Sequence, residues 1–364
     1  MVDSIIEKAL SGPRALGAGD LAVLVALDDP AEIGKVREAA YGLKCRYSGK
    51  VVSMRGIIEL GNVCAKDCYY CGIRKSNAKL ERYTLSADDI ARLAEIDAGQ
   101  GYASLVLQSG EVEGEAHTRF IEDCLRRIAP LGLGVTLSLG EQEEDVYRRW
   151  REAGAERYLL RIETSNPALY ARIHPESHSW ERRVECLRAL RRCGYQVGTG
   201  VMSALPGQTP DDLARDIVFF GEIDADMIGM GPYIPHCDTP LGRTAPELPA
   251  SERLRLGLNM ISATRLYLHD VNIASTTALQ ALAPDGREQG ILAGANVMMP
   301  NITDTKYRRS YQLYDGKPCL DENALMCRGC LERRLALLGE SVGYGRRGDS
   351  PHFLARTSAK APSA

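Results

Sequence analysis

Short runs of apolar and β-branched residues recur along the chain about every 25–40 residues, and helical patterns lie between most of them. Capping signals open several of the helical patterns, at Ser86, Thr209 and Ser251. Strands that alternate with helices are typical of an α/β fold with a parallel sheet, and eight of them predict a complete (β/α)8 barrel of the TIM type. The predicted strands cover residues 51–60, 104–109, 134–139, 157–162, 196–204, 227–233, 271–275 and 296–299.

The barrel is predicted over residues 47–304, between an N-terminal helical extension (1–46) and a C-terminal extension (305–364) whose last dozen residues are expected to fray. The chain is 45% hydrophobic with a net charge of −3, so neither nucleic acid nor an anionic membrane is an expected partner. No apolar run approaches the ~20 residues of a membrane span. Eleven cysteines without a secretion signal favour a reducing cytoplasm, where grouped thiols bind metal more often than they form disulfides.

Three of these cysteines, Cys64, Cys68 and Cys71, lie in one loop after the first predicted strand, with the spacing C-x3-C-x2-C. Barrel enzymes react at the C-terminal ends of their strands, so we expect this loop at the active rim. Three thiolates can hold three corners of a [4Fe–4S] cluster and leave the fourth iron open. Structural zinc is the alternative, but it prefers four protein ligands, and the nearby sequence has no further cysteine or histidine pair.

The loop resembles that of the radical S-adenosylmethionine (SAM) superfamily, which also has an aromatic residue, here Tyr70, before the third cysteine. The resemblance implies that the open iron binds SAM, and that one electron splits SAM into methionine and a 5′-deoxyadenosyl radical. It also implies that Gly110 and Glu111, in the Ser-Gly-Glu turn after the second strand, bind the methionine ammonium. An ordinary turn is the alternative for so short a motif.

Polar residues of the third and fourth strands are expected to face the barrel lumen. Alternation puts Thr136 and Ser138 on one face of their strand, and Arg161 and Glu163 on one face of theirs. The resemblance gives Ser138, Glu163 and Arg183, on the following helix, contacts with SAM. Two alternatives stay open: the hydroxyls bond only to neighbouring backbone, and Glu163 only neutralises a buried Arg161.

Five longer motifs together resemble the HydE family of [FeFe]-hydrogenase maturases, a biotin synthase-like branch of the radical SAM superfamily. They begin at Gln108, Thr136, Tyr158, Gly231 and Tyr307. The resemblance runs from about residue 45 to residue 345. Cys237 departs from the family pattern, which has proline there, but it puts no proposed ligand in doubt.

The HydE resemblance implies a role in building the diiron subcluster of the hydrogenase active site. The implied substrate is a cysteine-bound Fe(CO)2(CN) complex delivered by the maturase HydG, and the maturase HydF is a second implied partner. A flavodoxin or ferredoxin would supply the electron. The implied substrate site in the lumen comprises Gln108, Thr136, Arg161, Thr276, Thr277 and Tyr311.

A second cysteine group, Cys319, Cys327 and Cys330, has the spacing C-x7-C-x2-C. It resembles the second iron–sulfur site of many HydE proteins, a [2Fe–2S] or [4Fe–4S] cluster, although the cysteines alone also suit zinc. The nearest alternatives are biotin synthase-like and methylornithine synthase-like enzymes acting on a small amino-acid-like substrate. A non-enzymatic iron–sulfur carrier is a further alternative, but it would need no polar lumen.

Overall fold

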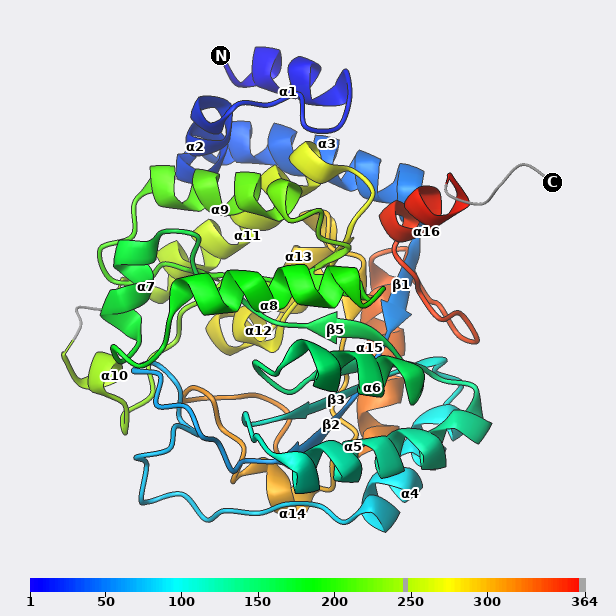
Figure 1. Ribbon diagram of the computed structural model, residues 1–364. Helices are drawn as coiled ribbons and strands as arrows, with labels where there is room; N and C mark the ends of the chain where they lie inside the picture. Colours follow the sequence, from blue (N-terminus) through cyan, green and yellow to red (C-terminus); the bar gives the residue numbers. More distant parts are fainter. Residues whose placement is uncertain (245–247, 360–364) are drawn as a thin grey trace.

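The computed structural model describes residues 1–244 and 248–359, and a curled parallel sheet lies at its centre with helices outside it (Figure 1). Seven strands form this sheet in the order β10-β8-β6-β5-β4-β3-β2. They are β2 (Gly56–Gly61), β3 (Ser104–Ser109), β4 (Gly134–Ser138), β5 (Ala155–Leu159), β6 (Gln196–Thr199), β8 (Met227–Ile228) and β10 (Asn272–Ile273). Seven of the eight predicted strands therefore lie side by side in sequence order.

The eighth predicted strand belongs to a separate parallel sheet of order β11-β1-β12. Its members are β1 (Val51–Met54), β11 (Val297–Met298) and β12 (Ser341–Val342). Isolated parallel bridges link Ala274 to Val297 and Ile57 to Asn301, so the β11 segment contacts both edge strands of the large sheet. A third sheet pairs β7 (Met202–Ser203) with β9 (Gly231–Pro232).

Helices connect successive strands and cover the outside of the large sheet (Figure 1). They are α4 (Ala87–Gly99), α5 (Glu115–Ile128), η1 (Ala129–Leu131), α6 (Glu144–Glu152), α7 (Pro167–Ile173), α8 (Trp180–Arg192), α9 (Pro210–Glu222), α10 (Pro240–Thr244), α11 (Ala250–Leu268), α12 (Thr277–Leu282) and α13 (Gly286–Leu292). Two predicted caps are confirmed, because Ser86 accepts from the Asp89 N–H at 3.1 Å and Thr209 from the Asp212 N–H at 3.2 Å. The third is wrong: α11 begins one residue before Ser251, and no side chain caps it.

Three helices precede β1 and lie over one end of the sheet. They are α1 (Val2–Leu10), α2 (Ala18–Ala26) and α3 (Pro30–Ser48). Asp29 caps α3, since its carboxylate accepts from the N–H groups of Ala31 and Glu32 at 2.9 Å, and Pro30 suits the first helical position. In Figure 1 the three helices stack above α9 and α11, and α2 packs on α9 while α3 packs on α11.

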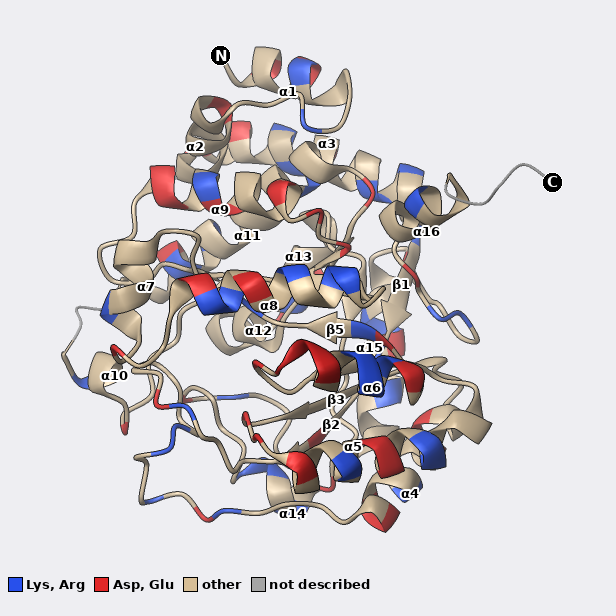
Figure 2. Cartoon of the chain, in the orientation of Figure 1, with Lys and Arg blue, Asp and Glu red and all other residues tan. Residues whose placement is uncertain are grey.

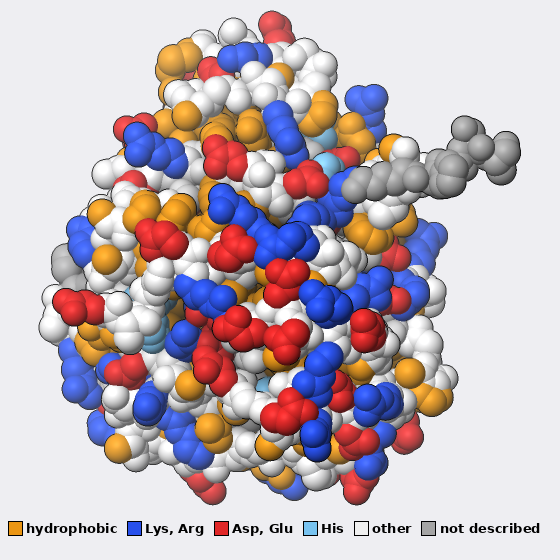
Figure 3. Space-filling model, in the orientation of Figure 1, with side chains coloured by type: hydrophobic (Ala, Val, Ile, Leu, Met, Phe, Trp, Pro, Cys, Tyr) orange, Lys and Arg blue, Asp and Glu red, His pale blue; other side chains and the backbone are white. Residues whose placement is uncertain are grey.

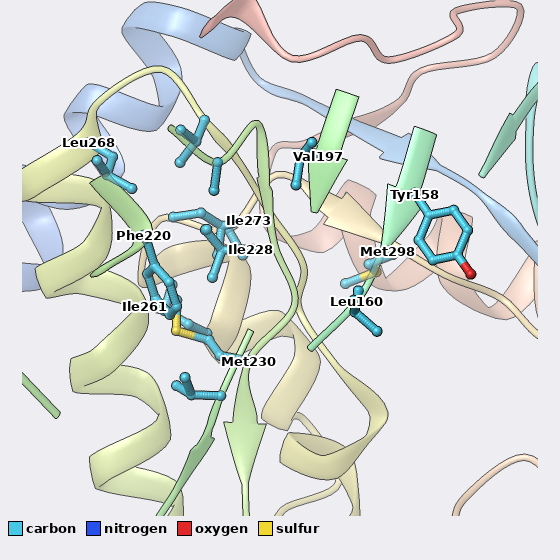
Figure 4. Packing of buried hydrophobic residues seen from close by; sticks show 14 of the residues in the cluster. Tyr158, Leu160, Val197, Phe220, Ile228, Met230, Ile261, Leu268, Ile273 and Met298 are labelled. Carbon is cyan, nitrogen blue, oxygen red and sulfur yellow. The ribbon is translucent and has the colours of Figure 1, made fainter. Parts of the chain in front are cut away.

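The main hydrophobic core lies between the outer face of the sheet and the helices (Figure 4). Alternation along the strands sends Leu137 and Leu139, and likewise Tyr158 and Leu160, into this core. The residue between the last two, Leu159, therefore faces the inside of the curl. A small apolar cluster from four strand segments lies there, formed by Leu159, Met227, Ala274 and Met299. Thr136, next to Leu137, shares the inner face.

After β11 the chain first passes the cysteine loop, where the Leu313 carbonyl accepts from the Gly72 N–H at 2.9 Å, and it later reaches the opposite end of the sheet. It forms α14 (Thr305–Arg308), α15 (Ala324–Leu337) and α16 (Pro351–Ser358). Residues 343–350, the C-terminal strap, run past the N-terminal ends of the strands. There the Gly348 carbonyl accepts from Arg55 at 3.0 Å, and Asp349 pairs with Arg157.

The prediction that the last dozen residues fray is wrong for residues 353–358. These residues belong to α16, which ends at residue 358. Residues 360–364, which also fall in the predicted frayed tail, lie outside the described residues.

Charged side chains of both signs alternate over the outer helices (Figure 2), and neither sign dominates the face shown in Figure 3. Many form ion pairs between neighbouring helices. Arg149 of α6, for example, lies 2.7 Å from both Glu115 and Glu122 of α5. In the part of the chain that the structure describes, no helix combines the length and the apolar character needed to cross a bilayer.

Candidate active site

The cysteine loop follows β2 at the C-terminal edge of the sheet, and the turn after β3 packs against it. The Gly110 N–H donates to the Gly61 carbonyl at 3.1 Å, and the Glu111 N–H lies 3.3 Å from the sulfur of Cys64. A side chain at position 110 would put its Cβ 2.2 Å from the carbonyl oxygen of Val63, so only glycine fits. The turn thus brings backbone N–H groups and one carboxylate to the first cysteine.

The three cysteines of the loop are partly buried. Burial raises the pKa of Cys68 to about 12. Burial also raises the pKa of Cys71 well above the usual thiol value, and the neighbouring Cys68 and Cys64 raise it further. Thiols of this kind lose their protons when a metal binds them. Three partly buried thiols in one loop are a donor set of the kind that holds three corners of a cubane cluster.

Two histidines that the sequence motifs do not include stand beside the loop. His174 and His178, between α7 and α8, each have a ring nitrogen within 4.8 Å of the sulfur of Cys68. The hydroxyl of Tyr70 lies 3.4 Å from His174 Nε2, and the two rings meet edge-on. His178 is 110 positions from Cys68 in the sequence, and no motif spacing connects residues so far apart. Only the fold brings them together.

An ion network lies on the other side of the loop. Lys66 is 3.1 Å from Glu111 and 2.9 Å from Glu141, and Arg183 is 2.5 Å from Glu141. Burial raises the pKa of Glu111; burial also acts on Glu141, but there Arg183 and Lys66 outweigh it and hold the pKa below its usual value. Arg183 also donates to the Arg161 carbonyl at 2.7 Å. Sequence reasoning gave Glu141 no role, yet it is the anion that Arg183 holds.

Arg161 and Glu163, just after β5, form an ion pair. The guanidinium lies 3.0 Å from the Glu163 carboxylate and donates to the Val201 carbonyl at 2.9 Å. Glu163 has a φ of 66°, and nearby Ala204 has a φ of 63°, left-handed values that are strained for residues with a side chain. Such strain concentrates at functional sites. Glu163 is buried, whereas 32% of the Arg161 side chain is exposed.

The predicted substrate residues of β3 and β4 lie on the inner face of the sheet. Gln108 pairs in register with Ser138, and its side-chain amide lies 3.3 Å from the hydroxyl of Tyr311. The buried hydroxyl of Thr136 has no hydrogen-bond partner among the described residues. An unpaired buried hydroxyl is costly, so a water molecule or a polar ligand would stabilise this one.

The segment after α14 adds lumen residues that sequence reasoning missed. The hydroxyl of Tyr314 lies 2.8 Å from that of Thr277, and Lys317 forms a buried ion pair with Glu59 of β2. The second oxygen of Glu59 has no hydrogen-bond partner among the described residues. Thr276 instead donates to a backbone carbonyl between β8 and β9 at 3.3 Å. The sequence feature that could have indicated these residues is Glu59, an acidic residue within an otherwise apolar strand.

Of the C-terminal cysteines, two are clearly brought together. Cys327 and Cys330 lie one turn apart on α15, and Cys319 lies on the loop before it with a φ of 62°. Burial raises the pKa of Cys327 to about 11, and Cys319 adds to the increase. Cys330 lines a surface pocket with Leu325 and Met326.

The radical SAM superfamily model matches residues 58–220, a range that contains the cysteine loop, the Gly110 turn and the Arg161–Glu163 pair. The [FeFe] hydrogenase maturase subunit HydE of Thermotoga maritima is 44% identical to this chain over 304 residues, which cover 83% of this chain and 84% of that protein. The chain belongs to the HydE family. This HydE-family chain is therefore a radical SAM enzyme, and its family implies a [4Fe–4S] cluster and SAM.

Two solved structures share the fold of this HydE-family chain. Methylornithine synthase (PylB) superimposes with a TM-score of 0.77 at 22% identity, over 98% of this chain and 99% of that one. The FeFe-hydrogenase maturase HydG from Carboxydothermus hydrogenoformans gives a TM-score of 0.79 at 20% identity, over 94% and 79% of the two chains. These likenesses support the barrel-like fold of radical SAM enzymes and, at this identity, the fold alone.

Proposed function

We propose that this HydE-family enzyme cleaves SAM reductively and works in the assembly of the diiron subcluster of the [FeFe]-hydrogenase active site. The observation that supports this best is a cysteine loop packed against the Gly110 turn at the C-terminal edge of the curled sheet, in a chain 44% identical to a HydE maturase. When bound, the cluster and SAM supply a 5′-deoxyadenosyl radical. The chain's own residues must hold both groups, exclude water and orient the substrate.

The loop cysteines Cys64, Cys68 and Cys71 would bind three irons of the cluster. The proposed SAM ligands are Tyr70, Gly110, Glu111, Ser138, Glu163 and Arg183. Glu111 supports this, because its buried carboxylate lies beside the cysteine loop and already pairs with an ammonium group, that of Lys66, at 3.1 Å. Arg183 would use Nη2 for the SAM carboxylate, since Nε holds Glu141 and Nη1 holds a strand carbonyl.

The proposed substrate is a cysteine-bound Fe(CO)2(CN) complex supplied by HydG. Its proposed ligands are Gln108, Thr136, Arg161, Thr276, Thr277 and Tyr311. Two donors support an anionic substrate: the unpaired hydroxyl of Thr136 and the partly exposed guanidinium of Arg161. In a shielded lumen, charge-assisted hydrogen bonds from such donors to a carboxylate or cyanide are stronger than neutral ones.

The eight strands are proposed to close into a complete barrel. The Ser275 N–H donates to the Val297 carbonyl at 2.9 Å, and the Ile57 N–H donates to the Pro300 carbonyl at 2.8 Å, so hydrogen bonds flank the β11 segment on both sides. The proposed organisation is an N-terminal helical extension (1–46), the barrel (47–304) and a C-terminal extension (305–364).

The second cysteine group is proposed to hold a [2Fe–2S] or [4Fe–4S] cluster, supported by the placement of Cys327 and Cys330 one turn apart on α15. The proposed partners are HydG, HydF and a flavodoxin or ferredoxin that donates electrons. The proposed location is the cytoplasm, where eleven free thiols stay reduced.

A coupled maturation assay tests the proposal. The anaerobically reconstituted protein is combined with HydG, HydF, SAM, a reductant and a hydrogenase that lacks its diiron subcluster. Hydrogen evolution should appear only when the protein is present. If the protein cleaves SAM but the hydrogenase stays inactive, while methylornithine is formed from a small amino acid, the maturation role is wrong and the methylornithine synthase alternative holds.

A further inference from the structure

The ring of His178 contacts two consecutive residues of the cysteine loop, Asp67 and Cys68. Its ring lies just before α8 and is buried. Nδ1 is 3.8 Å from the sulfur of Cys68, and Nε2 is 3.5 Å from the backbone nitrogen of Asp67. A single imidazole therefore spans a cluster-binding side chain and the peptide beside it.

The backbone of Asp67 determines where the proton of this imidazole lies. A peptide N–H can only donate, so Nε2 of His178 must be the acceptor and carries no proton. In the neutral ring the proton is then on Nδ1, the nitrogen that faces Cys68. The hydrogen bond between them runs from the ring to the sulfur.

His174 has a different task, although it lies next to His178. Its Nδ1 is 2.9 Å from the Tyr170 carbonyl, which can only accept, so Nδ1 carries the proton. Its Nε2 therefore accepts from the hydroxyl of Tyr70. His174 thus orients the aromatic residue of the loop, and its ring stacks on that of Tyr170 at 3.9 Å.

These proton positions argue against a mononuclear metal ion among Cys68, His174 and His178. A ring nitrogen that carries a proton offers no lone pair to a metal. The nitrogen of His178 that faces Cys68 carries one, and the lone pair of His174 Nε2 is taken by Tyr70. The sulfur of Cys68 therefore stays free for the cluster.

We propose that His178 donates an Nδ1–H···S hydrogen bond to the Cys68 thiolate of the bound cluster and raises the cluster's reduction potential. When the [4Fe–4S]2+ cluster takes up one electron from the external reductant, negative charge on its thiolates increases and no proton moves. A donor aimed at a thiolate stabilises the reduced form more than the oxidised form. His178 is a positioning residue that acts through Cys68, and the inference rests on the cluster alone, not on the hydrogenase substrate.

A potentiometric titration followed by electron paramagnetic resonance tests this on the reconstituted protein without SAM. In His178→Phe, the ratio of reduced to oxidised cluster at a fixed potential should fall about tenfold, a shift of about 59 mV to more negative potential. His178→Gln keeps an N–H donor and should recover part of the shift. His117→Phe, the same change in a ring packed against Trp150, should leave the potential unchanged. A wild-type midpoint in a fully iron-loaded His178→Phe protein overturns the proposal.

If His178→Phe fails to bind iron, a measurement on the wild-type protein tests the proposal instead. The protein is labelled with 15N-histidine, and electron–nuclear double resonance is recorded on the reduced cluster in H2O and D2O. The proposal predicts a weak 15N coupling together with an exchangeable proton close to the cluster. The absence of both, or a strong coupling typical of nitrogen bound directly to iron, contradicts it.

Discussion

Arg161 lies between two anions, one present in the structure and one proposed. Its guanidinium is 3.0 Å from Glu163, yet a third of the side chain remains exposed. A single guanidinium can bridge two carboxylates, because its nitrogens point in different directions. Substrate binding and SAM binding would then meet at this one side chain.

Replacing Arg161 with methionine distinguishes its proposed role in substrate binding from its ion pair with Glu163. Losing a charged hydrogen bond in a shielded site costs roughly 2–4 kcal/mol, so substrate affinity should fall about 30- to 1,000-fold. SAM affinity should change little, because the open iron and Arg183 still hold SAM. The measurements are SAM affinity, melting temperature and hydrogenase maturation on the one protein.

Arg161→Met/Glu163→Gln is the control for the opposite explanation. If Arg161 only neutralises Glu163, the single variant loses stability or SAM binding, and the double variant recovers both. Unchanged maturation by Arg161→Met would rule out the anion-binding role.

Asp97 of α4 gives a residue-scale prediction about stability. It is fully buried, neither carboxylate oxygen has a hydrogen-bond partner among the described residues, and burial raises its pKa to about 8. The unfolded chain loses this proton near pH 4, about four units earlier. Between those values the folded state binds more protons, so the free energy of unfolding falls as pH rises from about 4 to about 8.

Asp97→Asn removes this dependence. The variant should melt at a higher temperature than the wild type at pH 8.5, and its advantage should shrink toward pH 5. Asp88→Asn, an exposed change on the same helix, is the matched control. Equal melting temperatures of wild type and Asp97→Asn at pH 8.5 would show that the buried carboxyl is paired.

Single residues were predictable where a local motif defines them. The cysteine loop and the Gly110 turn follow from spacing and from the need for a residue without a side chain. Glu141, His178 and Lys317 were not found, because their partners lie tens to more than two hundred positions away. Only the folded backbone shows which charges face one another.

At the scale of elements, α16 shows how a terminal segment is fixed by charge. His352 lies 2.8 Å from Asp224 and 3.3 Å from Asp270, and Arg356 lies 2.7 Å from Asp224. Hydrogen bonds to both aspartates raise the pKa of His352 to about 9. A histidine whose pKa is raised by folding stabilises fully below its unfolded pKa of about 6.5, and this is lost as pH rises through about 9.

His352→Gln should therefore release α16 at low pH and have little effect at high pH. We expect a loss of roughly 2–4 kcal/mol at pH 6, most of which has disappeared by pH 9.5. Amide hydrogen exchange within Pro351–Ser358 measures the opening of the helix directly. Equal protection in variant and wild type at pH 6 would contradict the role of His352.

Elements with local signals were predicted better than those held by distant contacts. Ser86 and Thr209 cap α4 and α9 as expected, because the capping hydroxyl and the N–H group that donates to it lie within four consecutive residues. The tail was predicted to fray because its own composition is polar and small, but α16 is held by aspartates more than eighty positions earlier. The first predicted strand appears as two, β1 and β2, which belong to different sheets.

At the scale of the whole molecule, different segments of the chain lie at the two ends of the parallel strands. The C-terminal strap crosses one end through Gly348 and Asp349, and the cysteine loop stands at the other. The seven-stranded order followed from the alternation of strands and helices. The position of the strap did not, because the strap is held by backbone contacts and by ion pairs with residues far away in the sequence, Asp349 with Arg157 and Arg347 with Glu156. This arrangement leaves the end with the cysteine loop as the place where, on our proposal, SAM and substrate would meet.

Cys64, Cys68 and Cys71 are proposed to supply together the protein ligands of a cluster that cleaves SAM. The most direct measurement is the formation of 5′-deoxyadenosine from SAM by anaerobically reconstituted, reduced protein. Wild type and Cys45→Ala, a change at a cysteine outside both groups, should form it at similar rates, whereas Cys68→Ala should form none. A near wild-type rate in Cys68→Ala would contradict the account.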